Sequence, residues 1–443
     1  MHDVRVIGIR AFWSSLPTEG RWLLSTVAIQ TLGRGLTLPF TIIYLHEVRG
    51  FDLGLSGTLM SLIAIAGLVV TGPGGSLTDR LGARTVLLAG CASMAAGNVL
   101  LAFATTPAGA AVALVLIGIN FGVSWPAFNA LIAAVVEGDL RQKYFGVNFA
   151  LVNLGIGVGG IVGGLYVDVS DASTFTAIFL LDAATGLIPA ALLLGPLRRV
   201  SGRAEPPDED GTAEPPSYRA ILRRPEVLWL SGLTFVAVFV GYGQFEAGFP
   251  GYGRQVAEVS TRVVGLAFAV NTAVIVVLQF TVLNRISGRR RTRVIAVMAV
   301  VWAASWLLLG AAGLVPASAL AAIGMLAFMG VFAFGETLMQ PTVPAIANDL
   351  ASDHTRGRYN AISAGAFQAG AIAGPVVAGF LLEHDLASAY VGLMVVGCLG
   401  IAAMAYALER RIPPAANGVP GDAAIDPSAG AGDPAAPPAV VPD

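Results

Sequence analysis

The sequence predicts an all-α membrane protein with twelve transmembrane helices in two six-helix pseudo-symmetric halves. Hydrophobic residues make up 55% of the 443 residues and charged residues only 12%, against about 25% in a typical soluble protein. Long uncharged stretches recur along the chain, and most charges lie between them. This composition argues against a soluble enzyme. The net charge of −2 gives no strong attraction to nucleic acid, so no nucleic-acid partner is expected.

The spans follow from the length of the uncharged stretches. A bilayer core about 30 Å thick needs roughly 20 apolar residues as a helix. Residues 85–136 and 294–335 carry no charge and are each too long for one crossing, so we divide them at the turn residues 105–109 and 310–316. The twelve predicted spans are 21–46, 53–77, 84–104, 109–136, 144–167, 173–197, 227–250, 262–284, 293–313, 317–347, 359–382 and 386–408.

Two polar segments divide the chain. Residues 198–226 are charged and rich in Pro, Glu and Asp, which predicts a cytoplasmic linker between an N-terminal half, 1–197, and a C-terminal half, 227–411. Residues 412–443 consist largely of Pro, Ala, Gly and Asp. They cannot bury enough apolar surface to fold and predict a disordered cytoplasmic tail.

The basic residues predict the orientation, because lysine and arginine concentrate on the cytoplasmic side of short loops. Of the 26 lysines and arginines, Arg34 lies inside a span, and only Arg49, Arg254 and Arg262 fall on the sparsely charged side. We expect a multi-pass protein of the cell inner (plasma) membrane with both termini in the cytoplasm. The first apolar run continues to spanning length and is expected to be a retained span rather than a signal peptide.

The second half repeats the first at an offset of 215 residues. In this register Tyr144 aligns with Tyr359, and several glycines, one proline, two basic positions and one acidic position also match. Two halves built on one plan are typical of secondary transporters, whose substrate site lies between the halves near the midplane. The aligned pairs are Pro126 with Pro341, Arg141 with Arg356, Lys143 with Arg358, Asn153 with Gln368, Gly155 with Gly370, Gly159 with Gly374, Gly164 with Gly379, and Asp168 with Glu383.

A loop motif follows the second span. Gly75, three residues, Asp79-Arg80, one residue, Gly82, one residue and Arg84 have the spacing of the loop signature of the major facilitator superfamily. The chain therefore resembles that superfamily over its whole length. The resemblance implies a conformational latch that closes one face and breaks during transport. The alternative is that these charges only anchor the loop, while Gly82 permits a turn too tight for a side chain.

The fifth span resembles, with a departure, the antiporter signature of drug-exporting members of the superfamily. Residues 155–164 are rich in glycine, but Gly160 stands where the signature has proline. The Gly-Pro pair occurs in the eleventh span as Gly374-Pro375, and Gly118 stands near the place of an arginine common in proton-coupled relatives. The resemblance implies export by antiport.

Ionisable residues inside spans are costly and are functional candidates by default. Arg34 shares one predicted helical face with Gln30, Thr37 and Thr41, and this face is expected to line the central cavity. The first span therefore supplies the basic group of the predicted substrate or proton pathway.

Three acids complete this pathway. Glu336, four residues before Gln340, is the candidate for proton coupling or substrate binding, with a structural ion pair to Arg34 as the alternative. Asp182 is expected to be a satisfied packing acid. Glu246 is expected either in the pathway or at the outer interface.

Amides and aromatic residues supply the remaining candidates. Asn120 and Asn153 are further pathway candidates, with interhelical hydrogen bonds as the alternative. Trp125, Tyr242, Phe245 and Tyr252 are candidates for contact with an apolar substrate.

These residues predict a secondary active transporter that works by alternating access. Its most favoured activity is proton-coupled efflux of drug-like or amphiphilic compounds. The alternatives are a proton-coupled importer of a sugar, organic acid or peptide, and a non-transporting membrane scaffold or lipid-handling protein. The expected partners are a small-molecule substrate, protons or another coupling ion, and the lipid bilayer around a monomer. No Walker motif, clustered histidines or catalytic acid pair occurs in the sequence, so no ATP use, metal, cofactor or enzymatic activity is expected.

Overall fold

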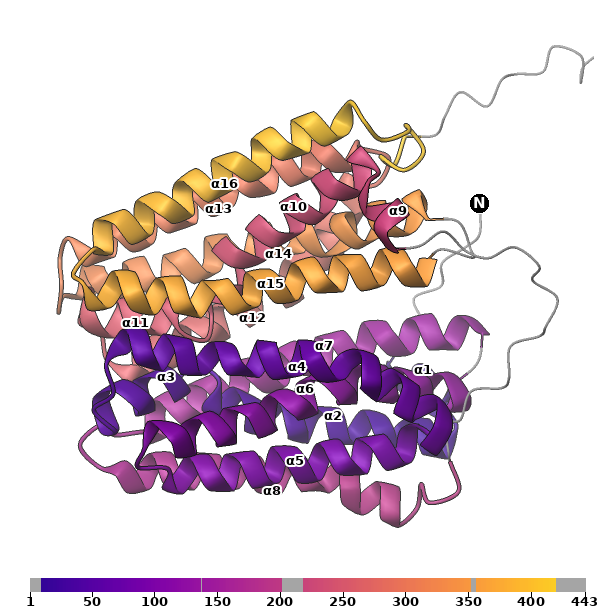
Figure 1. Cartoon of the computed structure of the whole chain (residues 1–443), viewed down its shortest axis with the longest axis horizontal. Coiled ribbons are helices and arrows are strands. Elements are labelled where there is room, and N and C mark those ends of the chain that lie inside the picture. The colour runs from indigo at the N-terminus through magenta and orange to yellow at the C-terminus, as the bar shows by residue number, and fades with distance from the viewer. Residues whose placement is uncertain (1–8, 137, 201–217, 352–355, 420–443) are drawn as a thin grey trace, which may run out of the picture.

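The computed structural model describes residues 9–136, 138–200, 218–351 and 356–419. These residues form helices and no β-strand, and Figure 1 shows α2 to α8 in one bundle and α10 to α16 in another. The elements are α1 (Ile9–Ser15), α2 (Thr18–Thr37), α3 (Thr41–Ile43), the π-helix η1 (Tyr44–Val48), α4 (Leu53–Leu81), α5 (Ala83–Phe103), α6 (Pro107–Val135), α7 (Gly138–Tyr166), α8 (Ala172–Leu194), α9 (Tyr218–Leu222), α10 (Pro225–Val240), the 3-10 helix η2 (Tyr242–Gln244), α11 (Gly248–Gln255), α12 (Thr261–Ile286), α13 (Arg291–Gly313), α14 (Ala319–Leu350), α15 (Arg356–Glu383) and α16 (Ala387–Glu409).

Eleven helices in the described residues are long and apolar enough to span a membrane. They correspond to the second to twelfth predicted spans. The helix α2 is not among the eleven, because Glu19, Arg21, Arg34 and other polar residues reduce its apolar character. It nevertheless packs in the N-terminal bundle against α7 and α8. The first of the twelve spans therefore stays a prediction.

Two predicted spans are not continuous helices, which corrects the sequence reading. The first span is interrupted after Thr37, where Pro39 lacks the N–H that would continue the helix, and resumes as α3 and η1. The seventh span is interrupted between α10 and α11, at the glycine-rich segment 241–247. Glycine tolerates the backbone conformations that such a break requires.

The break in the seventh span is held by side chains that replace helical hydrogen bonds. Inside a bilayer, backbone groups that a helix no longer satisfies need partners from the protein. Gln244 Nε2 donates to Phe239 O at 2.6 Å, and Trp306 Nε1 donates to Val240 O at 3.0 Å. Tyr390 OH in turn donates to Gln244 Oε1 at 2.9 Å. The break is thus a defined structure with satisfied polar groups.

The internal repeat appears as equivalent glycine contacts in the two halves. Within their own halves, Gly155 of α7 lies against α2, and Gly370 of α15 lies against α10. Across the halves, a Cβ at Gly164 would lie 2.8 Å from Thr261 O of α12. A Cβ at Gly379 would lie 2.6 Å from Leu53 O of α4. The repeated glycines therefore allow the same close backbone approaches in each half.

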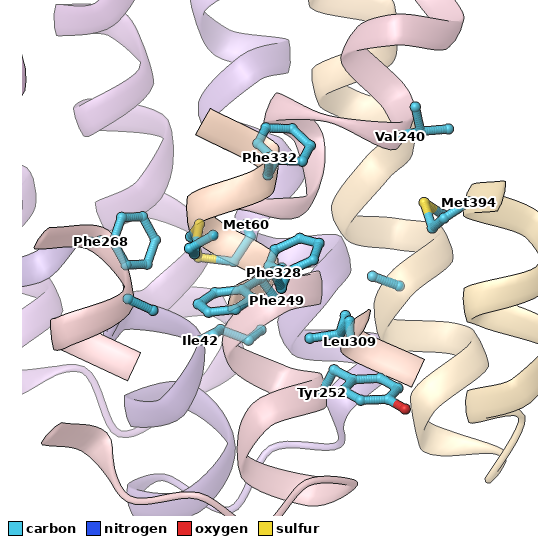
Figure 2. Close-up of a cluster of buried hydrophobic side chains, with 14 of the residues drawn as sticks. Ile42, Met60, Val240, Phe249, Tyr252, Phe268, Leu309, Phe328, Phe332 and Met394 are labelled. Atoms are coloured by element: carbon cyan, nitrogen blue, oxygen red, sulfur yellow. The ribbon is translucent and has the colours of Figure 1, made fainter. Parts of the chain in front are cut away.

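One buried apolar cluster joins the two halves at the end of the molecule that carries α3 and α11, here called the α11 end. Figure 2 shows Ile42 and Met60 of the N-terminal half beside Phe249, Phe268 and Phe328 of the C-terminal half. The rings of Phe249 and Phe328 stack at 5.2 Å between centroids. All five side chains are at most 4% exposed. This apolar contact seals the α11 end across the halves.

The opposite end, which carries α1 and α9, is here called the α9 end, and its buried cores stay separate in the described residues. One cluster there contains N-terminal-half residues such as Phe12, Leu131 and Tyr144. A second cluster contains Ile221, Val227 and Tyr359 of the C-terminal half. Within the part of the chain that the structure describes, the two halves therefore share an apolar core at the α11 end and keep separate cores at the α9 end.

The described parts of the predicted linker and tail are more ordered than the sequence indicated. Residues 218–222 form α9, and Arg224 Nη1 donates to Tyr359 OH at 3.0 Å. Asn417, placed by the sequence in the disordered tail, accepts the Thr292 N–H at 2.9 Å through its side chain and so caps α13. The rest of the predicted linker (201–217) and tail (420–443) lies outside the described residues.

Candidate functional site

A cavity of about 340 Å³ lies in the N-terminal half, between α2, α5, α6, α7 and α8. Its walls are mainly apolar, with Val27, Met94, Ile117, Phe121 and Phe128 among the lining side chains. Its polar lining includes Thr26, Gln30, Thr31, Arg34, Asn120, Ser124 and Asn148, and Glu246 of the C-terminal half. A cavity of this composition suits an apolar ligand with few polar groups.

An ion pair between the halves forms part of the cavity wall. Arg34 Nη2 lies 2.6 Å from Glu246 Oε1, and the two side chains are 16% and 26% exposed. The Arg34 guanidinium also lies 5.8 Å from the centroid of the Phe121 ring, within the range of a cation–π contact. The break in the seventh span places Glu246 beside Arg34 of the first. The alternative pairing of Arg34 with Glu336 is therefore wrong.

Asp182 lies on α8, close to this ion pair. It is fully buried, and its Oδ2 accepts from Thr37 Oγ1 at 2.9 Å. Its Oδ1 lies on the side of Asn98, whose side chain interacts with the carboxylate without a well-aligned hydrogen bond to Oδ1. Arg34 interacts with it electrostatically. The expectation of a satisfied packing acid is correct for only one of the two carboxylate oxygens.

The predicted polar face of the first span is only partly correct. Gln30 and Arg34 line the cavity. Thr37 instead binds Asp182, and Thr41 lies beyond the helix break, where its hydroxyl donates to Thr37 O at 2.9 Å. Because the helix ends at Thr37, the helical spacing that grouped Thr41 with Arg34 does not apply.

Glu336 belongs to a separate polar network in the C-terminal half. Asn271 Nδ2 donates to Glu336 Oε2, and Tyr242 OH also hydrogen-bonds to the Glu336 carboxylate. Gln340 Nε2 donates to Tyr242 OH at 2.6 Å, which leaves the tyrosine proton for Glu336. Glu336 is 5% exposed and makes no salt bridge among the described residues. Gln340 therefore supports Glu336 and does not line the N-terminal cavity.

Of the two asparagine candidates, only one lines the cavity. Asn120 lines the cavity and donates to Ser124 Oγ at 2.8 Å. Asn153 donates to Phe149 O at 2.9 Å within its own helix and does not line the cavity. The interhelical hydrogen bond at this position is made by the Asn153 backbone carbonyl, which accepts from Thr272 Oγ1 of α12 at 3.0 Å, and not by the side chain.

The aromatic candidates lie in the C-terminal half, apart from Trp125, whose side chain lies outside the described part. Tyr242 stacks on Phe367 with centroids 5.9 Å apart, and Phe245 contacts Phe268 at 5.9 Å. Tyr252 stacks on Tyr390 at 6.0 Å. These rings pack against one another, and none of the three lines the N-terminal cavity.

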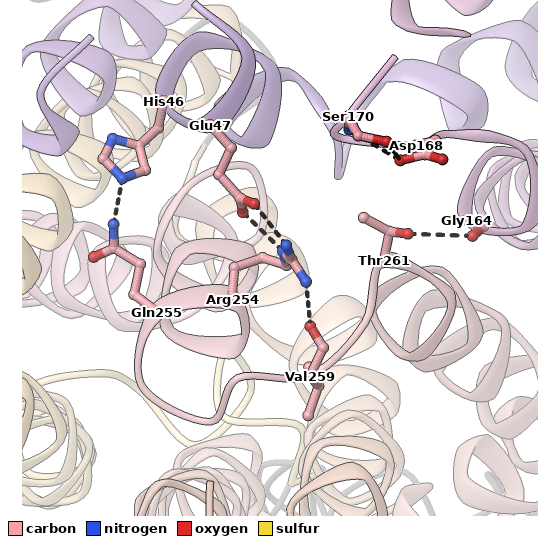
Figure 3. A network of polar contacts seen from close by, with 9 residues as sticks. All are labelled: His46, Glu47, Gly164, Asp168, Ser170, Arg254, Gln255, Val259 and Thr261. Carbon is pink, nitrogen blue, oxygen red and sulfur yellow. Dashed lines mark hydrogen bonds and ion pairs between the residues drawn. The ribbon is translucent and has the colours of Figure 1, made fainter. Parts of the chain in front are cut away.

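Polar contacts across the halves accompany the apolar seal at the α11 end (Figure 3). Arg254 of α11 binds Glu47 of η1 through two hydrogen bonds, at 2.7 and 2.6 Å. His46 contacts Gln255. The Gly54 N–H donates to Glu383 Oε2 at 2.8 Å. The sequence analysis missed this site, although Arg254 was one of the few basic residues on the sparsely charged side.

The residues of the predicted latch lie at the α9 end, where α4 meets α5. Gly82 links the two helices with φ of 86°, a left-handed conformation that favours glycine. Arg84 Nε donates to Leu193 O at 2.8 Å and so ties α5 to α8 in the same half. Arg80 is exposed at the end of α4. Gly75 lies in the same helix, and the Asp79 side chain lies outside the described part.

The two glycines that depart from the family signatures, Gly118 and Gly160, both lie at close contacts between helices. A Cβ at Gly118 would lie 2.5 Å from Ile63 O, so the close approach of α4 and α6 leaves no room for an arginine there. Gly160 packs on Phe268 of α12, where a Cβ would meet the Phe268 Cβ at 3.3 Å. Both glycines therefore serve helix contacts in this chain.

Comparison with known proteins identifies the family of this chain. The family model of the Major Facilitator Superfamily matches residues 23–335 and 258–439, and the chain belongs to that superfamily. It is therefore a membrane-spanning transporter and not an enzyme. Such a transporter binds a small-molecule substrate and moves it across the membrane.

Sequence relatives include transporters from several bacteria. The uncharacterized MFS-type transporter YttB of Bacillus subtilis is 26% identical over 83% of this chain and 89% of its own. The uncharacterized MFS-type transporter YdeE of Escherichia coli is 25% identical over 60% of this chain and 65% of its own. The quinolone resistance protein NorA of Staphylococcus aureus is 29% identical over 32% of this chain and 37% of its own.

Solved structures share the fold at low sequence identity. A POT family transporter in complex with a thioalcohol-conjugated peptide has a TM-score of 0.69 and 15% identity, covering 90% of this chain and 98% of that one. A bacterial homologue of the human lysosomal transporter Spinster, in an inward-facing and unoccupied conformation, has a TM-score of 0.67 and 15% identity. It covers 92% of this chain and 100% of that one. These likenesses concern the fold alone.

Proposed function

We propose that this transporter is a proton-coupled exporter of drug-like or amphiphilic compounds. The observation that carries the proposal is the largely apolar cavity of about 340 Å³ with an Arg34–Glu246 ion pair in its wall. Apolar walls favour amphiphilic ligands over sugars, which need many hydrogen-bond donors and acceptors. The partial similarity to the quinolone resistance protein adds support from sequence.

Glu336 is the proposed coupling residue in the C-terminal half. Its carboxylate is buried and is held by Asn271 and Tyr242 rather than by a basic residue of the described chain. Buried carboxylates in membrane spans commonly form proton relays. Alternating exposure of Glu336 to the two sides of the membrane would load and release a proton.

The proposed transport cycle depends on which end of the molecule faces the cytoplasm. We assign the α11 end to the outer face and the α9 end, with the Gly75–Arg84 latch and both termini, to the cytoplasm. The basic residues of the sequence support this orientation. The present conformation, sealed at the α11 end, would then admit substrate from the cytoplasm to a monomeric carrier.

Proteoliposomes with an imposed proton gradient test the function. We expect extrusion of a fluorescent amphiphile from wild-type vesicles and loss of gradient-driven extrusion in Glu336→Gln. A carrier with full gradient dependence after Glu336→Gln would contradict coupling through that residue. Orientation is checked separately with a reporter fused after Arg199, which we expect in the cytoplasm.

Import of an organic acid or peptide is the second candidate. It is favoured by Arg34, whose guanidinium could bind a substrate carboxylate in place of Glu246. The same vesicles distinguish the two functions, because import would accumulate an anionic substrate along the proton gradient. Failure of both assays would leave the scaffold or lipid-handling role.

A further inference from the structure

The helices α13 and α16 present neighbouring apolar faces on the outside of the C-terminal half. They pack against each other, and Figure 1 shows α16 on the side of its bundle that faces away from the N-terminal half. The exposed residues of each helix recur at intervals of three or four, so they share one helical face. They are Val297, Val300, Ala304 and Leu307 on α13, and Val396, Leu399, Ala403 and Tyr406 on α16. In a membrane-spanning protein these faces contact the hydrocarbon of the bilayer.

Both faces lead into arginines at the α9 end. Arg293 precedes Val297 by four residues, and Arg410 follows Tyr406 by four, so each arginine continues the apolar face of its helix. The last turns of α16 lie at the same end of the molecule as α9 (Figure 1). The Arg293 side chain is 70% exposed. Arginines at the end of a lipid-facing helix extend their charge to the level of the phospholipid headgroups.

Four arginines in this region share a single acid. Arg290 Nη1 lies 2.6 Å from Glu409 Oε1, and Arg293 Nη2 lies 3.3 Å from the same oxygen. Neither Arg410 nor Arg411 makes a salt bridge with any described residue. Four positive charges against one negative charge leave a surplus of three. A surface with this surplus attracts anionic headgroups.

Aromatic rings order the two arginines that have no acidic partner. Arg410 Nη2 donates to Tyr406 OH at 2.9 Å, and its guanidinium lies 4.7 Å from the centroid of the Tyr406 ring. The Arg411 guanidinium lies 4.8 Å from the centroid of the Trp229 ring of α10 and donates to Ala407 O. Tyrosine and tryptophan are enriched where the hydrocarbon meets the headgroups. The remaining N–H groups of these planar guanidinium groups suit the oxygens of a phosphate.

We propose that Arg290, Arg293, Arg410 and Arg411, here called the α13–α16 rim, bind the phosphates of an anionic phospholipid. The acyl chains of this lipid lie along the apolar faces of α13 and α16. A lipid with two phosphates matches the charge surplus best, whereas a zwitterionic lipid brings a cation of its own to a positive surface. None of the four arginines lines the cavity. The lipid is therefore a second ligand, bound apart from the transported substrate.

The equivalent position in the N-terminal half is less ordered for such a lipid. After α8, the sixth long helix of that half as α16 is of the other, Arg198 and Arg199 are exposed, and the described residues show no contact of either side chain. Arg84 at the start of α5 instead donates to Leu193 O of its own half. A lipid bound there has to order two long side chains, a cost that the α13–α16 rim avoids.

Lipid binding to the purified full-length protein in a neutral detergent tests the site. The probes are tetraoleoyl cardiolipin, which has two phosphates, and dioleoyl phosphatidylcholine, which is zwitterionic. Native mass spectrometry gives the affinity for the first lipid bound. We expect wild type to bind cardiolipin at least about tenfold more tightly than phosphatidylcholine, since each arginine near the headgroup contributes about fivefold in affinity.

Paired substitutions locate the binding. The double variant Arg410→Gln, Arg411→Gln should bind cardiolipin roughly 25-fold more weakly than wild type, at about fivefold per arginine. The matched control is Arg198→Gln, Arg199→Gln, which removes the same charge from the end of α8 and should stay within about twofold of wild type. The pair Arg410→Lys, Arg411→Lys should lose less affinity than the glutamine pair, because the charges stay and only the planar donor groups are lost.

The outcomes distinguish a lipid site from general attraction and from a site for a soluble anion. Equal losses in the two glutamine pairs would show general charge attraction and would overturn the site. Equal affinity of wild type for cardiolipin and phosphatidylcholine would do the same. Inorganic phosphate should displace cardiolipin no more than chloride does at equal ionic strength, and a larger displacement would assign the arginines to a soluble anion.

A single variant keeps the test valid if the glutamine pair is not monodisperse on gel filtration. Arg293→Gln changes one side chain that is largely exposed, and it should weaken cardiolipin binding about fivefold. Wild-type affinity in this variant would overturn the site. Failure of gradient-driven export in vesicles would contradict the proposed function and leave the lipid site standing, because the rim lies outside the cavity.

Discussion

The two ends of the molecule differ in how the halves meet. At the α11 end, Ile42 and Met60 share one buried core with Phe249 and Phe268, and Glu47 binds Arg254 at the rim. At the α9 end the buried clusters of the described residues each stay within one half. Among the described residues, the repeated fold therefore shows a buried apolar core shared between the halves at the α11 end. Such an asymmetry agrees with alternating access, in which the two ends are never open at the same time.

Covalent closure of the α11 end should have the largest effect. The double variant Glu47→Cys, Arg254→Cys places one thiol on each side of the present ion pair, and a reducible bifunctional thiol reagent that spans the two would prevent that end from opening. We expect transport in vesicles to be lost after crosslinking with this reagent and restored by reduction. The natural Cys91 and Cys398 are buried and should not interfere. Either single cysteine variant serves as the control, and transport by the crosslinked protein would contradict the comparison.

A large side chain introduced where α15 crosses α4 should have the second-largest effect. Gly379→Leu would drive a side chain against the α4 backbone, where a Cβ already lies 2.6 Å from Leu53 O. We expect the seal at the α11 end to weaken by about 1–3 kcal/mol, the usual cost of overpacking. Spin-label distances across that end should lengthen. Gly400→Leu is the matched control, because nothing lies within 4 Å of its Cβ position, and it should leave the distances unchanged.

Loss of the rim ion pair should have a smaller effect. Glu47→Gln removes the charge opposite Arg254, whose side chain is 19% exposed. A pair with this much solvent contact contributes about 1 kcal/mol. We expect a shift towards the form that is open at the α11 end, measured by the same spin-label distances, and a smaller shift at high salt. An equal shift at low and high salt would argue against the ion pair as the cause.

A contact within one half at the same end should not alter the seal. Ser170 donates to Asp168 Oδ1 through its hydroxyl at 2.6 Å and its backbone N–H at 2.9 Å, which lowers the pKa of Asp168 below its ordinary value. A lowered pKa stabilises the fold above the unfolded value, and this contribution is lost as the pH falls through the folded value. Ser170→Ala should slightly reduce the melting temperature at neutral pH and reduce it less at acidic pH. The spin-label distances should not change.

The sequence could predict the fold because its main physical causes are local. Uncharged stretches of spanning length predicted the places of eleven helices, although the seventh helix ends at Val240, ten residues before its predicted bound. The repeat at residues 155–164 and 370–379 identified glycines that make equivalent contacts in the two halves. The breaks at Pro39 and at Gly241 were missed because hydropathy does not distinguish a continuous apolar span from one interrupted by glycine or proline.

The site was harder to predict because its contacts join distant segments. Helical spacing identified Gln30 and Arg34 as cavity residues, and burial of charge identified Asp182, Glu246 and Glu336 as unusual. Spacing could not show that Arg34 meets Glu246, because the pairing depends on the break in the seventh span and on the packing of one half against the other. Roles such as that of Trp306, which stabilises the break, have no sequence pattern of their own.

The interruption of the seventh span gives α11 a mechanical role. This helix has Glu246 just before its first residue and Arg254 near its last, and its eight residues make a strut about 12 Å long. At one end of α11, Glu246 lines the cavity. At the other end, Arg254 binds Glu47 of the N-terminal half. A change at Glu246 in the cavity can therefore reach the rim ion pair of Arg254 through one short helix, which the break separates from α10.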